Sequence, residues 1–134
     1  IYGNGKNSRE WIHVQDHCEA LLLIFLKGNL GESYNIGSGQ NIKNIDLAKK
    51  LLKIAKRKTL KIGERVKIKF VKDRPGHDFR YALDNNKILR KLSWKAKIPL
   101  QVGLSQTFDW YINNKAFFKS VSKKLYINRL GLKI

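Results

Sequence analysis

Cysteine, proline and acidic residues are scarce in this sequence, and methionine is absent. The chain holds one cysteine and two prolines, and its 10 acidic residues stand against 28 Lys and Arg. A single cysteine, Cys18, excludes an internal disulfide and a metal site built from several cysteines. Because Cys18 stands among Glu19, Ala20 and Leu21 in a predicted helix, the sequence favours a buried structural thiol over a reactive one.

A long apolar run is also lacking. The longest, residues 20–26, is far shorter than the roughly 20 residues that span a bilayer, so no membrane partner is expected. No secretory signal pattern opens the chain, and its first residue is Ile1 rather than Met. We therefore expect a fragment or a processed piece of a cytoplasmic protein. With 134 residues, of which 43% are hydrophobic, the chain is expected to be globular with one modest core.

The formal net charge of +18 permits three interpretations. It could serve nucleic-acid binding through phosphate neutralisation, or attract an anionic small molecule, or reflect a compositional bias towards Lys, Ile and Asn. The lysines are scattered along the chain instead of forming one stripe. We favour the bias, with attraction of an anionic ligand as a secondary benefit, and regard a nucleic-acid partner as unlikely.

Local patterns predict an α/β fold with mostly helices and a few short strands. Apolar residues recur at helical spacing over residues 16–27, 44–55, 85–92 and 100–119. Short strands are predicted at 33–36 and at 66–71, where apolar residues alternate with lysines. Residues 56–64 read as a basic connection, and a basic tail begins at 120. The strand–helix alternation of a doubly wound sheet is missing.

The most distinctive polar stretch follows the second predicted strand. It places two acids, an arginine, a histidine and a Pro-Gly turn within residues 73–78 (DRPGHD). Proline fixes φ and glycine permits a sharp reversal, while Arg74 offers a fork of donors suited to a phosphate and His77 can donate near neutral pH. The stretch is either a ligand-binding loop or a solvated turn whose charges pair with one another.

Two further polar residues are candidates for ligand contacts. Arg9 follows a Gly- and Asn-rich loop and could clamp a diphosphate, or it could form a salt bridge to Glu10 or Asp16. Asn44 stands directly before an apolar helical stripe, so helix capping is the favoured role over ligand contact.

Other arrangements that could carry chemistry are weaker. Tyr111 and Lys115 have the Tyr-x-x-x-Lys spacing of short-chain dehydrogenases, but no Gly-rich dinucleotide turn precedes them, and we interpret Tyr111 as a core residue. His13, His17 and His77 do not form a metal set with a carboxylate or cysteine. We therefore predict no catalytic residue and no metal site in this chain.

Several segments together resemble one family. Residues 1–5 (IYGNG), 9–20 (REWIHVQDHCEA) and 31–37 (GESYNIG) are similar to extended short-chain dehydrogenase/reductases. Residues 70–84 (FVKDRPGHDFRYALD) are more specific and resemble the dTDP-glucose 4,6-dehydratases. The resemblance extends over roughly residues 1–118, with mild departures at Glu10 and Gln15, where the family usually has Asp and Glu.

This resemblance implies the C-terminal substrate-binding lobe of such an enzyme, over residues 1–119, followed by a basic tail over 120–134. Ile1 and Tyr2 match the stretch that contacts the nucleotide, Arg9 matches a residue at the diphosphate, and Asn44 matches a substrate contact that is compatible with capping because helix N-termini suit phosphates. The resemblance implies that the remaining wall of the pocket is formed by Asp73, Arg74, Pro75, Gly76 and His77.

The family reaction moves hydride from C4 of dTDP-glucose to a tightly bound NAD, removes water across C5 and C6, and returns the hydride to C6. The resemblance implies that NAD and the catalytic residues belong to a Rossmann domain missing from this chain. The chain alone is therefore expected to be inactive, and the full enzyme to be a homodimer. The alternatives are the lobe of a related UDP- or GDP-sugar dehydratase, epimerase or decarboxylase and, from another class, a basic nucleic-acid-binding module.

Overall fold

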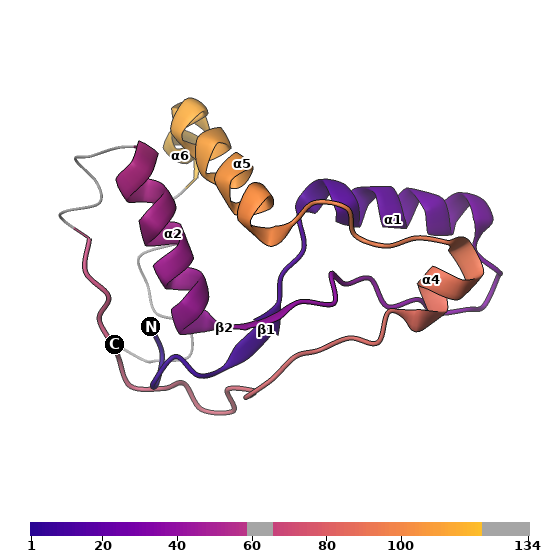
Figure 1. Cartoon of the computed structure of the whole chain (residues 1–134), viewed down its shortest axis with the longest axis horizontal. Coiled ribbons are helices and arrows are strands. Elements are labelled where there is room, and N and C mark those ends of the chain that lie inside the picture. The colour runs from indigo at the N-terminus through magenta and orange to yellow at the C-terminus, as the bar shows by residue number, and fades with distance from the viewer. Residues whose placement is uncertain (59–65, 122–134) are drawn as a thin grey trace.

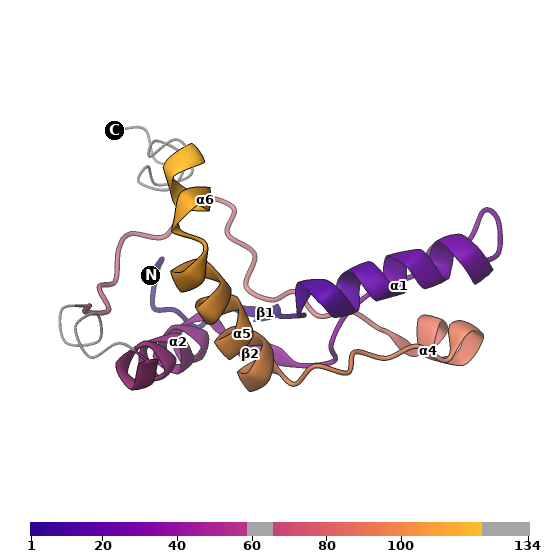
Figure 2. The same cartoon turned by 90° about the horizontal axis from the view of Figure 1, so that it is seen from above.

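The computed structural model describes residues 1–58 and 66–121. Figure 1 shows two groups of helices with a small sheet between them: α1 and α4 lie at one end, and α2, α5 and α6 at the other. The turned view in Figure 2 shows the same division. In chain order the elements are β1 (Ser8–Glu10), α1 (Val14–Lys27), β2 (Asn41–Lys43), α2 (Asn44–Lys58), α4 (Asn86–Leu92), α5 (Leu100–Asn113) and α6 (Lys115–Ser120).

The sheet joins distant parts of the sequence. Strands β1 and β2 pair antiparallel, with Arg9 opposite Ile42 at the centre of the register. On the other edge of β1, the Ser8 amide donates to the Phe79 carbonyl at 2.9 Å and the Tyr81 amide donates to the Ser8 carbonyl at 3.1 Å. The segment around residue 80 therefore runs beside β1 and fixes the position of the preceding loop.

The α1 end has its own core. Ala20 on α1, Ile88 on α4 and Trp94 pack together, and all three are buried. The carboxylate of Asp16, only 1% exposed, accepts hydrogen bonds from the Lys97 and Ile98 amides at 3.2 and 2.9 Å. These bonds hold the chain against α1 just before α5 begins.

The α2 end is built on a second apolar contact. Leu47, Ile54 and Ala55 are the buried residues of α2, which packs against α5. Gly103 on α5 is buried close to His13, the residue that caps α1 by accepting a bond from the Gln15 amide. The two ends are therefore connected by packing as well as by the sheet.

The predicted fold class is confirmed, and the four predicted helices are present with changed ends. The last one is wrong as a single helix, because the chain breaks at Asn114 between α5 and α6. There the backbone amide and the side chain of Asn114 both donate to the Trp110 carbonyl, at 2.9 and 2.8 Å, and the Asn114 backbone leaves helical geometry with φ −108° and ψ 52°. Helix α2 extends to Lys58, three residues into the predicted basic connection. The rest of that connection (59–64), and residues 122–134 of the tail, lie outside the described residues.

Three further predictions are wrong. Residues 33–36 are not a strand, and residues 66–71 contribute only a bridge between Val71 and Tyr2. Alternating polarity indicates an extended chain, but a strand also needs a neighbour for its backbone, and neither segment has a ladder partner among the described residues. Cys18 is exposed instead of buried, since α1 turns that side away from its core.

Candidate functional site

The loop at residues 73–77 is closed by its own side chains. Pro75 and Gly76 form the turn, with Gly76 at φ 65°. Nδ1 of His77 lies 2.6 Å from Oδ1 of Asp73, and the Arg74 amide donates to the same oxygen at 2.9 Å. The hydrogen bond from His77, supported by the Arg74 amide, holds the pKa of the Asp73 carboxyl below its usual value. The predicted internal pairing is therefore present.

The first residues of the chain lie against this loop. The Val71 amide donates to the Ile1 carbonyl at 2.8 Å, and the Gly3 amide donates to the Val71 carbonyl at 2.9 Å. The Tyr2 ring meets the His77 ring edge-on, with centroids 6.1 Å apart. A Cβ on Gly3 would lie 2.7 Å from Oδ2 of Asp73, so only glycine fits at this contact. Segments 1–3 and 73–77 thus form one cluster.

Arg9 is held just beyond the same loop. Its guanidinium donates to the Ser8 and Asp78 carbonyls, both at 2.7 Å, and lies 4.6 Å from the centroid of the Tyr81 ring. The alternative salt bridges to Glu10 and Asp16 are not formed. A guanidinium has five N–H donors, and two of these are used here, so Arg9 is oriented and retains donors for an anion.

Asn7 connects Arg9 to the start of α2, and sequence reasoning missed it. The side chain of Asn7, which is 5% exposed, donates to the Asp78 carbonyl at 3.1 Å. Its own carbonyl accepts from the Asn44 amide at 2.9 Å. Asn44 is the first residue of α2. Asn7 therefore links the start of this helix to the Asp78 carbonyl, which also accepts a hydrogen bond from Arg9. Nothing in the Gly- and Asn-rich sequence distinguishes Asn7 from an ordinary turn residue.

Glu10 is a second residue that the sequence did not reveal as a connector. One carboxylate oxygen accepts from the Gly39 amide at 2.5 Å and from the Asn85 side chain at 3.2 Å, and the other accepts from the Leu83 amide at 2.9 Å. Partial burial acts to raise the pKa of Glu10, but hydrogen bonds from Leu83, Gly39 and Asn85 outweigh it and hold the pKa below its usual value. A Cβ at Gly37 would overlap this carboxylate.

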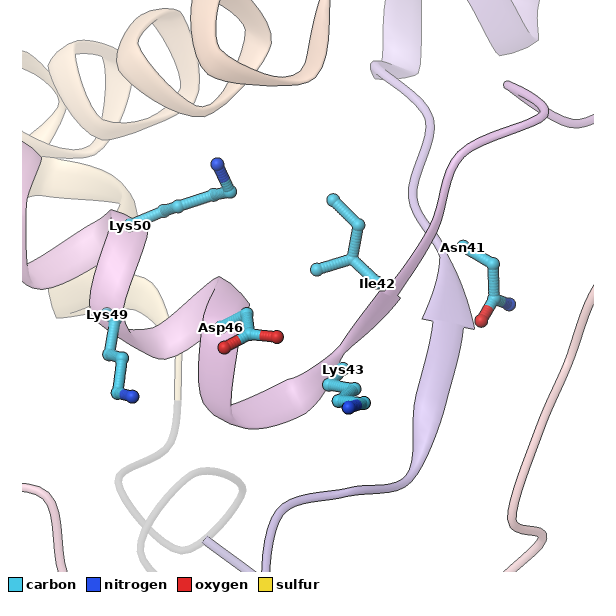
Figure 3. Close-up of a pocket in the computed structure, with 6 residues that line it drawn as sticks. All are labelled: Asn41, Ile42, Lys43, Asp46, Lys49 and Lys50. Atoms are coloured by element: carbon cyan, nitrogen blue, oxygen red, sulfur yellow. The ribbon is translucent and has the colours of Figure 1, made fainter.

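An open hollow of about 540 Å³ lies beside the start of α2 (Figure 3). Its lining consists of one amide side chain, one apolar side chain and four charged side chains. These residues are Asn41, Ile42, Lys43, Asp46, Lys49 and Lys50. None of the nine predicted substrate-binding residues lines it. The cluster around the 73–77 loop, and not this hollow, is therefore the candidate site.

Tyr111 and Lys115 do not form a catalytic pair. Asn114 interrupts the helix between them, so they lie on α5 and α6 respectively. The Tyr111 ring meets the Trp110 ring edge-on, with centroids 5.1 Å apart. Tyr111 is 42% exposed, so its interpretation as a core residue is wrong. Within residues 1–58 and 66–121, no group of three His, Cys, Asp or Glu could hold a metal ion, and no helix is long and apolar enough to cross a membrane.

Comparison with known proteins defines the class. A family model described as GDP-mannose 4,6 dehydratase matches residues 1–107, and the chain belongs to this family. Its listed relatives include dTDP-glucose 4,6-dehydratases: that of Escherichia coli is 39% identical over 98% of this chain and 38% of the relative, and that of Streptomyces niveus is 41% identical over 89% and 34%. The predicted resemblance is confirmed. The chain spans little more than a third of the length of these relatives.

Solved structures of nucleotide-sugar enzymes have the same fold as this chain. The dTDP-glucose 4,6-dehydratase of Bacillus anthracis in complex with NAD is 36% identical, with a TM-score of 0.77 over 89% of this chain and 36% of that one. The UDP-glucose 4-epimerase of Thermotoga maritima, solved with UDP-glucose, is 30% identical, with a TM-score of 0.76 over 86% of this chain and 35% of that one. The fold is thus shared by enzymes that act on different nucleotide sugars.

Proposed function

We propose that residues 1–119 form the nucleotide-sugar-binding lobe of a dTDP-glucose 4,6-dehydratase, with residues 120–134 as a basic tail outside it. One observation carries the proposal. Two segments about 70 residues apart, 1–3 and 73–77, meet through the backbone bonds of Val71 and the contact between Tyr2 and His77. Both segments belong to the stretch that aligns with dTDP-glucose 4,6-dehydratases.

The charges of this cluster suit a nucleotide diphosphate. Arg9 is oriented by two carbonyls and keeps free donors, and the Arg74 guanidinium makes no hydrogen bond to another described side chain. Two arginines can bind phosphate oxygens in a bidentate manner. Ile1 and Tyr2 would contact the nucleotide, Asn44 the substrate beside Arg9, and the pocket wall would comprise Asp73, Pro75, Gly76 and His77.

NAD has no evident site in the described residues of this chain. The two strands β1 and β2 are antiparallel, whereas dinucleotide sites form where a parallel strand leads through a Gly-rich turn into a helix. We assign NAD, the hydride acceptor of this chemistry, and the catalytic residues to the part of the enzyme that this chain does not cover. The chain alone would then be inactive, and the whole enzyme would be a cytoplasmic homodimer.

A chimaera tests the assignment. The 134-residue chain replaces the segment that it matches in the Escherichia coli relative, and turnover of dTDP-glucose is compared with that of UDP- and GDP-glucose. We expect a preference for dTDP-glucose. Arg74→Gln should lower kcat/KM about 10- to 100-fold by removing charge-assisted bonds to the diphosphate. Arg90→Gln, at an exposed position of α4, is the matched control and should leave kcat/KM unchanged.

Two results would contradict the proposal. Equal turnover of UDP- or GDP-glucose would favour the lobe of a related enzyme, and an Arg74→Gln variant with the kinetics of Arg90→Gln would remove the loop from the site. Dehydratase activity of the isolated chain would show that it carries its own catalytic residues.

A further inference from the structure

The guanidinium of Arg9 is held in place without an acidic partner. Glu10 and Asp16, the two acids that follow it in the sequence, accept hydrogen bonds from backbone amides elsewhere. The carboxylate of Asp78 accepts a hydrogen bond from the Tyr81 hydroxyl. Among residues 1–58 and 66–121, no ion pair includes Arg9. No carboxylate of the described chain therefore competes with an anion from outside for this guanidinium.

Three neutral groups orient this guanidinium instead. The Ser8 carbonyl and the Asp78 carbonyl each accept from it at 2.7 Å. The Asp78 carbonyl also accepts from the Asn7 side chain at 3.1 Å, so both lone pairs of this oxygen are used. The third group is the ring of Tyr81, whose centroid lies 4.6 Å from the guanidinium carbon, within the range of a cation–π contact.

The side-chain bond of Asn7 is not needed to align the backbone. Strand β1 is already joined to residues 79–81 by the two backbone hydrogen bonds of Ser8. Asn7 is nevertheless only 5% exposed, and burying an amide costs free energy unless its groups are hydrogen-bonded. The amide makes its bond to the same carbonyl that holds Arg9. The Asn7 side chain therefore supports the orientation of Arg9 more directly than the pairing of the strand.

We infer that Asn7 and Tyr81 are positioning residues, which hold the Arg9 guanidinium in the orientation that binds the diphosphate of the substrate. This inference rests on the proposed function, in which Arg9 contacts the diphosphate. Asn7 acts through the Asp78 carbonyl, and Tyr81 acts through its ring. An arginine that is ordered before binding loses less conformational entropy on binding, so its two supports raise the affinity through Arg9 alone.

Inhibition of the chimaera by two ligands tests the role of Asn7. dTDP carries the diphosphate and thymidine lacks it, so a residue that acts through Arg9 affects only the binding of dTDP. We expect Asn7→Ala to raise the Ki of dTDP about 3- to 10-fold, because the guanidinium must then be ordered on binding, and to leave the Ki of thymidine unchanged. Both constants are measured against turnover of dTDP-glucose.

Asn35→Ala is the matched control for this experiment. The Asn35 side chain also donates to a backbone carbonyl at 3.1 Å, that of Asp84, which is not a carbonyl that Arg9 uses. Asn35→Ala should leave both inhibition constants unchanged. A purely structural role of Asn7 would instead weaken dTDP and thymidine equally, or would lower kcat, and either result would overturn the inference.

Tyr81 offers a second test at a position that is 53% exposed, where a substitution leaves the core intact. Tyr81→Leu removes the ring and should raise the Ki of dTDP about 2- to 5-fold, whereas Tyr81→Phe keeps the ring and should restore most of the affinity. Both Asn7→Ala and Tyr81→Leu should raise the KM for dTDP-glucose with kcat unchanged, since Arg9 binds the diphosphate equally in the ground state and the transition state.

A double-mutant cycle identifies the residue through which Asn7 acts. Arg9→Gln should raise the Ki of dTDP about 10- to 100-fold. Addition of Asn7→Ala should raise it no further, because no guanidinium remains to be positioned. Additive losses, or a large effect of Arg9→Gln without effects of Asn7→Ala and Tyr81→Leu, would refute the inference alone. An Arg9→Gln variant with the native Ki for dTDP would refute the proposed diphosphate contact, and the inference with it.

Discussion

Helices α1 and α2 have nearly the same length, 14 and 15 residues, and opposite outer faces. Each packs an apolar side inward, α1 against α4 and α2 against α5. Outward, α1 presents Phe25 at 84% exposure, whereas α2 presents exposed lysines such as Lys49, Lys53 and Lys56. The basic character of the chain therefore does not extend over α1. The outward side of α1 is therefore apolar, whereas the outward side of α2 is basic.

The largest expected effect concerns whether the two ends fold together. Ile88 and Ile54 are 0% and 3% exposed in the cores of the α1 and α2 ends. We expect Ile88→Ala and Ile54→Ala each to lower the free energy of unfolding by about 2–5 kcal/mol, because each leaves a cavity. Urea unfolding followed by circular dichroism and by tryptophan fluorescence measures this loss. Two separate transitions would show that the ends are independent units.

A smaller effect is expected on the outer faces themselves. At high salt, which screens the repulsion between chains, Leu22→Lys should weaken self-association of the isolated chain on the order of ten-fold, since it places a charge among the exposed apolar side chains of α1. Lys53→Leu on α2 should strengthen it. Sedimentation velocity at several protein concentrations measures both changes. Identical behaviour of the two variants would show that the outward sides of α1 and α2 do not differ in their contribution to association.

Glu10 links the sheet to the α1 end, and its effect should depend on pH. Its pKa is lower in the folded chain than its ordinary value of 4.5, so the unfolded chain takes up a proton first as the pH falls. The stabilisation is complete above pH 4.5 and disappears as the pH drops through the folded-state pKa. Glu10→Gln should flatten this dependence and lower the melting temperature by a few degrees at neutral pH.

The melting temperature of both proteins, measured from acid to neutral pH, tests this expectation. A native chain whose melting temperature falls with acid no more than that of the Glu10→Gln variant would show that the carboxylate has no such role.

The smallest effect belongs to the α2 end. Lys58 and Asp109 form an ion pair between α2 and α5, with side chains 30% and 47% exposed. Water and salt screen such a pair, so Asp109→Asn should cost less than about 1 kcal/mol in the free energy of unfolding. Urea titrations at low and high salt measure it. A larger loss that persists in salt would mean that this end depends on electrostatics more than on Leu47 and Ile54.

The sequence predicted what local periodicity decides. The helices around Leu21, Leu51 and Leu104 follow from apolar spacing, and the turn at Pro75 from its residue types. The break at Asn114 was missed because apolar spacing does not record a change of backbone geometry at a single residue, such as the one at Asn114. Strand predictions failed at 33–36 and 66–71 because alternating polarity does not reveal whether a neighbouring strand is present, and neither segment has a ladder partner among the described residues.

The candidate site was harder to predict than the fold. Resemblance placed Ile1 and His77 at one pocket, but only the structure joins them, through Val71. Asn7 and Glu10 were overlooked because their importance comes from contacts to residues about 70 positions away, which no pattern in the neighbouring sequence indicates.

The contact between Glu10 and Gly37 also limits how this chain can vary. With Glu10 in its observed position, a Cβ at 37 would overlap the carboxylate, so a side chain at 37 would displace Glu10 from its hydrogen bonds. An aspartate at position 10 would be shorter by one methylene and would relieve the overlap with an alanine at position 37. The two positions are thus coupled, and a side chain at 37 is expected to be tolerated better beside a shorter residue at position 10 than beside Glu10.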